Sequence, residues 1–409
     1  MAHEGLSPAG TCDGGFTRVP IRVRAFWREA CPAAQPAACP IRYNLCTMHT
    51  DLATTNLRAY GWDPIFAERF APYAEQGLLP ARVVVGYQDI YRVVAEEGEI
   101  LATVAGRMRH RANGRLDHPG VGDWVAIRPD PDSDRATIHG VVERKSRFIR
   151  KIAGSVVAEQ IVAANVDVVL LVTGLDADFN PRRLERYLVL AHESGARPVI
   201  VLSKSDLSPD LAEHVRLARS VGGPGVPVHT VSAPRGEGYD VLHGYLAPGQ
   251  TVALLGSSGV GKSTIVNHLA GEELQRTQEV RTTDGRGRHT TTHRQVILLP
   301  SGGLLMDTPG MRELQLWDVN EGVEETFADL EELAADCRFP DCQHAQEPDC
   351  AVLAAIADGR LAAARLESYR KLHRELRALA ARQDHQNRLF EKRRVKAATK
   401  AFNRHAPRK

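Results

Sequence analysis

The 409-residue sequence has no apolar run that approaches the roughly 20 residues needed to cross a bilayer. Its N-terminus also lacks the charged-then-apolar layout of a secretory signal. We therefore expect a cytoplasmic protein with no membrane partner. The net charge is only +2, so the overall balance does not by itself indicate a polyanionic partner. With 43% hydrophobic and 25% charged residues, the chain is globular and long enough for two or three domains.

Cysteine is scarce and unevenly placed, with 7 in the whole chain. Residues 1–47 hold Cys12, Cys31, Cys39 and Cys46 among Pro, Ala and Arg, without sustained periodicity. We expect this segment to be disordered, or to be an extension that precedes the true start at Met48.

The later cysteines form the pattern Cys337-x4-Cys342-x-His344-x5-Cys350. Three thiolates and one imidazole match the number and softness of ligands in a closed tetrahedral Zn²⁺ site. A disulfide is disfavoured in the cytoplasm, and three cysteines cannot all pair. The spacing therefore predicts one structural zinc per chain, because no ligand position stays open for a substrate.

Five short β-rich runs occupy residues 81–150, after a lead segment at residues 48–80. They read ARVVVGY, IYRVVAE, EILATVAGRM, VGDWVAIRP and ATIHGVVER, and Gly, Asn, Asp or Pro separates them. Five strands in so short a segment predict a small barrel, and the OB-fold is the commonest such barrel that binds nucleic acid. A barrel that serves only for packing is the alternative on fold alone.

Strands and helices alternate in residues 158–320. NVDVVLLVT is nearly all apolar, as is typical of a parallel strand covered on both faces. In the segment that follows, Asn180 can cap a helix, Pro181 suits its first turn, and Leu184 and Leu188 belong to one apolar stripe. The pattern predicts a doubly wound α/β domain, which binds ligands at the carboxyl ends of its strands.

The segment GSSGVGKS, between an apolar strand and an apolar helix, matches the P-loop pattern G-x-x-x-x-G-K-S. Its backbone N–H groups can surround a phosphate, and the helix that follows directs its positive end at the same charge. Lys262 is expected to reach the terminal phosphates and Ser263 to ligate Mg²⁺. The nucleotide-binding set here is Gly256, Ser257, Ser258, Gly259, Val260, Gly261, Lys262, Ser263 and Thr264.

A second phosphate motif, DTPG, follows the strand GGLLM. Asp307 is placed to hold the Mg²⁺ shell through water and to take part in catalysis, and the Gly310 amide is placed to meet a γ-phosphate. A D-x-x-G match alone is weak. After a buried strand in the same domain as a P-loop, it is good evidence for a nucleoside triphosphatase.

The segment SKSD, directly after the strand RPVIVL, is the candidate reader of the base. A carboxylate at Asp206 can accept both N1–H and N2–H₂ of guanine, and adenine lacks this donor pair. Lys204 can lie along the base plane, and a loop after VPVHTV can contact the guanine oxygen. The base-reading set is Ser203, Lys204, Ser205, Asp206, Ser232 and Ala233, and it precedes the P-loop.

This order of motifs, with VGDWV in the barrel, SAPRGEG before the P-loop, GRGRHTTTH before DTPG and CRFPDCQHAQEPDC after it, resembles the RsgA family of circularly permuted, small-ribosomal-subunit-dependent GTPases. The resemblance covers roughly residues 50–380. It implies an OB domain, a circularly permuted GTPase domain and a helical zinc domain (residues 321–381) that act in late maturation of the small ribosomal subunit. Its ligands and partners are then GTP or GDP with Mg²⁺ and the subunit's rRNA, and a monomer is expected. Ser203 stands where the family usually has Asn or Thr, which implies a somewhat weaker affinity for guanine.

The residue that orients the attacking water is not obvious. Ras-like enzymes use a Gln directly after D-x-x-G, but Met311 occupies that place and has no useful donor or acceptor. The glycine-rich loop GRGRHTTT offers His289 beside Thr290, Thr291 and Thr292, any of which can ligate Mg²⁺, and Thr291 is the candidate catalytic threonine. A packing or rRNA-contact role for His289 is the alternative.

Basic residues suggest two surfaces for rRNA. The tail at residues 382–409 has ten Lys or Arg residues against Asp384 and Glu391. The second surface comprises the barrel residues Arg107, Arg109, Arg111 and Arg115. A solvated charged face is the alternative for both.

Two functions compete at this point. One is a GTPase that couples hydrolysis to release from rRNA, and the other is an assembly protein for which the nucleotide is mainly a conformational ligand. An ATP-using P-loop enzyme is a third reading, against which SKSD argues directly.

Overall fold

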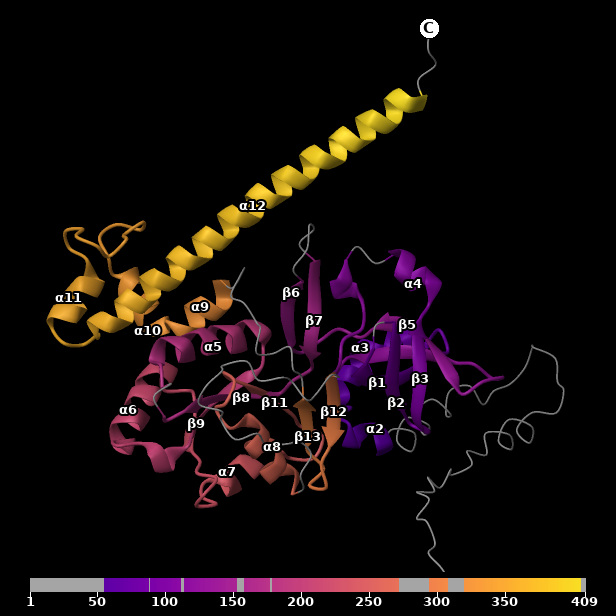
Figure 1. Cartoon of the computed structure of the whole chain (residues 1–409), viewed down its shortest axis with the longest axis horizontal. Helices are drawn as coiled ribbons and strands as arrows, with labels where there is room; N and C mark the ends of the chain where they lie inside the picture. The colour runs from indigo at the N-terminus through magenta and orange to yellow at the C-terminus, as the bar shows by residue number, and fades with distance from the viewer. Residues whose placement is uncertain are drawn as a thin grey trace, which may run out of the picture. The chain divides into compact units, whose positions relative to one another are not determined.

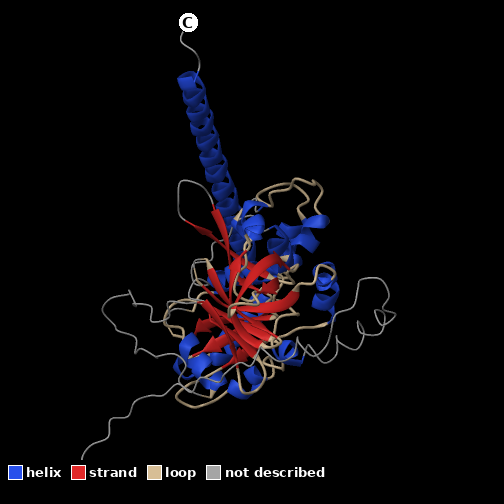
Figure 2. Cartoon of the chain, turned by 90° about the vertical axis from the view of Figure 1, so that its right-hand side faces the viewer, coloured by secondary structure: helices blue, strands red, loops and turns tan. Residues whose placement is uncertain are grey.

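The computed structural model describes residues 55–87, 89–111, 114–152, 158–176, 179–271, 294–307 and 320–405. The expectation for residues 1–47 falls outside this part. Figure 1 labels the helices and strands along the chain, and Figure 2 shows the strands with helices around them. Among the described residues, no helix combines the length and the apolar character that a bilayer span requires.

Five strands close into a barrel. They are β1 (Leu79–Gly86), β2 (Ile90–Ala95), β3 (Gly98–Val104), β4 (Trp124–Pro129) and β5 (Arg135–Val141). The order β1-β2-β3-β5-β4 returns to β1 through an antiparallel β1–β4 pairing, and β3 runs parallel to β5. Val83, Val93, Ile127 and Ile138 fill the interior. This closure confirms the predicted OB-fold, whose barrel leaves few strand edges unpaired. Between β3 and β4 lie α4 (Gly106–Arg111) and the 3₁₀ turn η2 (Arg115–Asp117).

The lead segment is more structured than the sequence analysis indicated. It forms α2 (Thr55–Ala59) and α3 (Pro64–Ala74). Asp63 caps α3 by accepting a hydrogen bond from the Phe66 backbone N–H (3.0 Å). Phe66 and Phe70 then pack with Trp124 of the barrel in one buried cluster. An Asp-Pro start followed by aromatic residues four positions apart is a helix signal that could have predicted α3.

A second set of strands forms the predicted α/β sheet. The parallel strands are β10 (Val228–Thr230), β9 (Arg197–Ser203), β8 (Val168–Gly174), β11 (Thr251–Leu255) and β13 (Leu304–Asp307), and β12 (Arg294–Leu298) adds antiparallel to β13. The helices are α5 (Pro181–Ser194), α6 (Leu211–Gly222), α7 (Tyr239–His243) and α8 (Lys262–Ala270). Alternate residues of β8 face opposite clusters: Leu171 packs with Leu184 of α5, and Leu170 with Ile265 of α8. The sheet is therefore covered on both faces, as predicted.

Helix α5 has the boundaries that its sequence indicated. The Asn180 side chain accepts hydrogen bonds from the backbone N–H groups of Arg182 (3.0 Å) and Arg183 (3.3 Å). Pro181 opens the helix, and Gly195 ends it in the left-handed conformation. The cap and the first turn were predicted from local residue types, because these effects act within one turn.

The barrel and the α/β sheet are joined into one hydrogen-bonded sheet, which the sequence did not indicate. Strand β1 pairs antiparallel with β12, with Val85 opposite Gln295. Between the barrel and β8 lies a two-stranded hairpin, β6 (Arg147–Ile152) and β7 (Ala158–Ala164). Neither strand of this hairpin was predicted.

Arg82 of β1 is the polar group at this junction. Its side chain is 1% exposed, and its guanidinium donates to the carbonyls of Tyr60, Gly122 (3.3 Å) and Asn165 (3.2 Å) and to Thr251 Oγ1 (2.8 Å). Burial lowers the pKa of Arg82 to about 10, which still leaves it charged at neutral pH. The residue thus ties the lead segment, the barrel and the first residue of β11 together.

The C-terminal part is helical, as predicted. It contains α9 (Asn320–Thr326), α10 (Ala328–Ala335), α11 (Ala351–Ala357) and α12 (Ala363–His405). Phe327, Leu330, Val352 and Leu366 form its core, and Val189 of α5 belongs to the same cluster. Helix α12 passes residues 381 and 382 without a break, so the segment predicted as the helical zinc domain and the segment predicted as the basic tail share one element (Figure 1).

Gly122 provides a test of the junction. Its φ is +91°, and an added Cβ would lie 2.1 Å from the Ala164 carbonyl oxygen and 2.6 Å from Met306 Cε. We expect Gly122→Ala to lower the free energy of unfolding by about 3 kcal/mol, because left-handed strain adds to a backbone clash. Urea unfolding measures this.

Gly77→Ala is the matched control. Gly77 has φ +71°, but nothing lies within 4 Å of an added Cβ. We expect a loss of only about 1 kcal/mol, from strain alone. Equal losses for the two variants would mean that the close approach at Gly122 contributes nothing.

Candidate functional site

The P-loop connects β11 to α8 at the carboxyl end of the parallel strands. Gly259 (φ +79°) and Gly261 (φ +91°) adopt the left-handed region that favours glycine. A Cβ at Gly256 would lie 2.3 Å from the Val172 carbonyl oxygen on the neighbouring strand. Glycine is therefore required at three places for the loop to take a shape in which successive N–H groups can face an anion.

Lys262 begins α8, and its side chain bends back over the loop. The ammonium donates to the carbonyl oxygens of Gly256 (2.8 Å) and Ser257. The side chain is largely buried, so its charge lies against the loop rather than in solvent. Tyr187 of α5 reaches the same loop, with its hydroxyl 3.2 Å from Ser257 Oγ. The loop is thus held from its own helix and from α5.

Ser203, the last residue of β9, contacts the P-loop directly. It is 3% exposed, and its hydroxyl donates to the Val260 carbonyl oxygen (2.5 Å). The predicted base-reading segment and the predicted phosphate loop are therefore in hydrogen-bond contact, although 57 positions separate the two residues. A serine makes this contact despite its short side chain.

Lys204 is held by a residue that the sequence analysis missed. Its backbone is left-handed (φ +56°), and its ammonium forms an ion pair with Asp176 Oδ2 at 2.5 Å. Asp176 follows β8, the neighbouring parallel strand. A polar residue just past the carboxyl end of a buried strand is the signal that could have identified it.

Asp206 lies in the 3₁₀ turn η3 (Ser205–Leu207) and meets the second predicted base loop. Ser232, which is fully buried, donates to Asp206 Oδ1 at 2.6 Å. A pair of backbone hydrogen bonds between Ser232 and Glu237, each 3.1 Å, fixes this loop. Burial, followed by the charge of Asp206, raises the pKa of nearby Tyr239. The structure thus brings together the two loops that the sequence assigned to the base.

Part of the predicted site falls outside the described residues. This holds for His289, Thr291, Gly310 and the side chain of Asp307. The backbone of Asp307 ends β13, which pairs with β11, so the two phosphate motifs follow neighbouring strands. Ser263 and Thr264 lie in the first turn of α8.

A separate cluster near the C-terminus unites Cys337, Cys342, His344 and Cys350, whose ligand atoms all lie within 4.8 Å of one another. The sulfurs of Cys337 and Cys350 are 3.8 Å apart, and His344 Nδ1 lies 3.6 Å and 3.5 Å from them. Zn–S bonds of about 2.3 Å in a tetrahedron separate two sulfurs by roughly 3.8 Å. The donor set and its spacing therefore fit a zinc ion.

The surroundings of this cluster favour the metal-binding forms of Cys337 and His344, whereas burial, with the neighbouring thiols, raises the pKa of Cys342 to about 11. Burial acts to raise the pKa of Cys337, but the N–H groups of Ala351 and Val352 at the start of α11 donate to its sulfur and leave the pKa below its ordinary value. Burial also lowers the pKa of His344, which keeps the imidazole neutral. Arg370 of α12 donates to the His344 carbonyl and connects the cluster to that helix.

Comparison with protein families gives two matches. The RsgA GTPase model matches residues 141–317. The ABC transporter model matches residues 239–397, a range that includes the P-loop, which many nucleotide-binding proteins have.

Curated relatives agree with the first match. The chain is 50% identical over 339 residues to the "Small ribosomal subunit biogenesis GTPase RsgA" of Opitutus terrae, and the match spans 80% of this chain and 91% of that protein. It is 44% identical to the protein of the same name in Syntrophotalea carbinolica, over 78% of this chain and 90% of that protein.

Solved structures agree as well. YjeQ from Thermotoga maritima is 29% identical with a TM-score of 0.56, over 73% of this chain and 98% of that one. YloQ, described as a circularly permuted GTPase, is 25% identical with a TM-score of 0.53, over 74% of this chain and 96% of that one. On the strength of the Opitutus terrae relative, which it matches over nine-tenths of that protein's length, this chain belongs to the RsgA GTPase family.

Proposed function

We propose that the protein hydrolyses GTP in late maturation of the small ribosomal subunit and uses hydrolysis to control its own release from rRNA. The observation that carries the GTPase part is the Asp206–Ser232 hydrogen bond, beside a Ser203 that contacts the P-loop. A carboxylate suited to guanine then lies next to a loop suited to phosphate. The names of the curated relatives support the ribosomal part. The proposal implies a monomer that meets its partner in the cytoplasm.

Each part of the nucleotide has a proposed contact. The P-loop N–H groups and Lys262 bind the phosphates, Asp206 accepts the N–H groups of guanine, and Lys204, fixed by Asp176, lies along the base. Ser263 and Asp307 are the proposed Mg²⁺ residues. When bound, Mg²⁺ neutralises charge that develops on the phosphates. His289 and Thr291 remain the proposed catalytic residues, to be ordered by the ribosomal partner.

One structural Zn²⁺ is proposed at Cys337, Cys342, His344 and Cys350. Its role is to hold the segment between α10 and α11, which offers few buried apolar side chains of its own. All four donors belong to the chain, so no position is left for a reacting water. The metal therefore contributes to folding and not to hydrolysis.

Turnover with and without small ribosomal subunits tests the proposed function. We expect subunits to raise the rate of GTP hydrolysis at least tenfold, since a partner that orders catalytic groups in GTPases contributes factors of about 10³ or more. Large ribosomal subunits are the control. An assembly protein with incidental turnover would hydrolyse GTP equally slowly in all three conditions.

Asp206→Asn tests the assignment of the base reader. We expect GTP binding to weaken more than tenfold, about 1.4 kcal/mol or more. We also expect preference to shift toward xanthine nucleotides, because the amide replaces one acceptor by a donor. Competition between GTP and XTP measures both effects. Asp210→Asn is the control, because Asp210 caps α6 by accepting from the Glu213 N–H (3.0 Å) and has no proposed role in the site. Unchanged selectivity in Asp206→Asn would remove SKSD from the base site.

Cys350→Ser tests the metal. We expect purified wild-type protein to carry one zinc per chain and the variant to lose it, because a neutral hydroxyl is a poor substitute for a thiolate. The control is Gln343→Ala, an exposed position between two ligands. Metal analysis and thermal unfolding with and without a chelator provide the measurement. Full zinc content in Cys350→Ser would contradict the assigned ligand set.

A further inference from the structure

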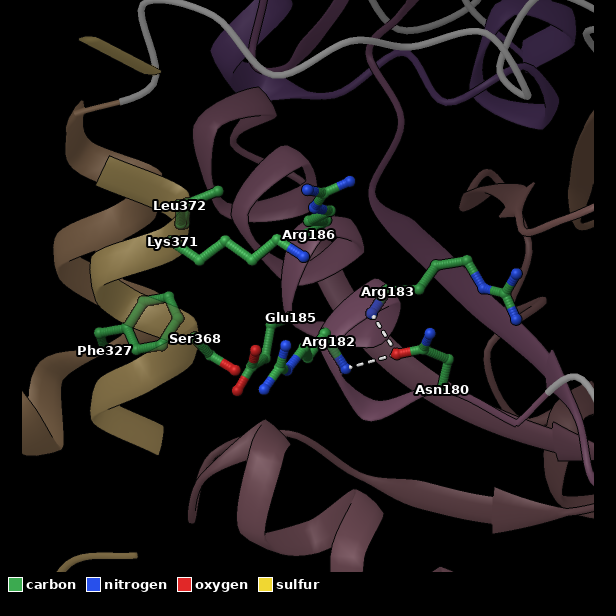
Figure 3. A pocket seen from close by; sticks show the side chains of 9 residues that line it. All are labelled: Asn180, Arg182, Arg183, Glu185, Arg186, Phe327, Ser368, Lys371 and Leu372. Atoms are coloured by element: carbon green, nitrogen blue, oxygen red, sulfur yellow. Dashed lines mark hydrogen bonds between the residues drawn. The ribbon is translucent and has the colours of Figure 1, made fainter. Parts of the chain in front are cut away.

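A pocket of about 340 Å³ lies between the start of α5 and α12, and none of its lining residues belongs to the proposed nucleotide or zinc sites. Four of the lining residues are cationic (Arg182, Arg183, Arg186 and Lys371), and Glu185 is the one acid among them. Figure 3 shows Lys371 extending from α12 toward Arg186, with Arg182 beside Glu185, whereas Arg183 turns away. Two helices far apart in sequence therefore supply an excess of positive charge to one cavity.

Arg182, Arg186 and Lys371 have N–H donors that the neighbouring carboxylates do not use. Arg182 contacts Glu367 Oε2 through one nitrogen at 2.8 Å, and Arg186 pairs with Glu375. A guanidinium has five N–H donors, so a single carboxylate contact uses only part of it. Within the described part of the chain, the Lys371 ammonium has no hydrogen-bond or ion-pair partner. Exposed ion pairs of this kind contribute little to stability, so a more highly charged anion can replace the glutamates.

Glu185 does not oppose an anion strongly, because its charge is already compensated. Its carboxylate pairs with Arg365 at 3.2 Å, and both side chains are less than 10% exposed. Burial raises the pKa of Glu185, against the opposing effects of Arg365 and Ser368. The acid thus belongs to a buried ion pair behind the pocket.

The chemistry of the lining favours phosphate. Guanidinium groups bind phosphate oxygens through paired N–H donors, and a lysine adds a point charge. Arg182 and Arg186 are four positions apart and share a face of α5. On α12, Arg374 lies one turn beyond Lys371 and is exposed, so the cationic surface continues outside the pocket. Apolar contact comes only from Phe327 and Leu372 among the lining residues, which gives a protein partner little to anchor on.

We propose that this pocket binds a phosphate of the RNA backbone, as a contact additional to the barrel and the end of α12. Arg182, Arg186 and Lys371 bind the phosphate oxygens, which displace Glu367 and Glu375 from the two arginines. The inference rests on the proposed function, because the small ribosomal subunit is the source of the RNA.

The test measures binding of the full chain to polyuridylate RNA and to small ribosomal subunits over a range of salt concentrations. For Arg186→Ala/Lys371→Ala we expect affinity to fall about tenfold and the slope of log K against log salt to fall by about one, as for one lost phosphate contact. Arg216→Ala is the control, since Arg216 is an exposed α6 residue whose one ion-pair partner among the described residues is Glu213. An unchanged slope in the double variant overturns the proposal.

Glu367→Gln is a second test, because it is expected to raise the affinity for RNA, and a misfolded variant would not bind RNA more tightly. Removing this carboxylate releases Arg182, so we expect RNA to bind about threefold tighter, and weaker or equal binding counts against the site. In a further arm, inorganic pyrophosphate is added in the presence of saturating GDP, which occupies the proposed phosphate loop. Suppose that pyrophosphate stabilises the wild type but not Arg186→Ala/Lys371→Ala, and that the two proteins have the same slope of log K for RNA against log salt. The pocket is then a site for a free anion, and the RNA assignment is wrong. If the wild type binds polyuridylate but not small ribosomal subunits, the proposed function is wrong. The salt dependence of polyuridylate binding still tests whether the pocket binds RNA.

Discussion

The buried guanidinium of Arg82 is the constraint on which the arrangement of the protein depends. A buried charge is costly unless its N–H groups find acceptors. Here the acceptors come from four separate segments, through Tyr60, Gly122, Asn165 and Thr251. These segments can satisfy one side chain only in one mutual arrangement, so the barrel, the lead helices and the nucleotide sheet are placed together. The β1–β12 pairing and the glycine contact at Gly122 depend on the same junction.

The candidate nucleotide site is connected to Arg82 through β11. This strand begins at Thr251, which accepts a hydrogen bond from Arg82, and it ends at the P-loop. The neighbouring strand β8 ends at Gly174, shortly before Asp176, and β9, the next strand beyond it, ends at Ser203. Parallel strands bring their carboxyl ends to one edge, which is why a serine contact and a lysine–aspartate pair can join three loops. These contacts restrict the base-reading loops and the P-loop in the described structure.

Helix α5 connects the nucleotide domain to the C-terminal helices. Leu184 packs against the sheet, Val189 packs in the helical core with Phe327, and Tyr187 reaches the P-loop. Arg365 of α12 adds polar contacts, donating to Glu185 on α5 and to the carbonyl of Thr326, the last residue of α9. Because α5 contributes to both cores, a change in the position of α12 would also move α5, which contacts the P-loop through Tyr187.

The sequence alone determined the features that are local. The P-loop glycines, the α5 cap and the grouping of three cysteines with His344 were predicted, because backbone conformation, capping and ligand spacing act over a few positions. The OB barrel followed from its strand and turn pattern, whereas α3 was missed although its Asp63-Pro64 start was visible. Only the tertiary structure decided the contacts of Arg82 with Thr251, of Lys204 with Asp176 and of α5 with α12. Those partners lie 28 to 189 positions apart, and no local pattern in a single sequence records which distant residue will satisfy a charged side chain.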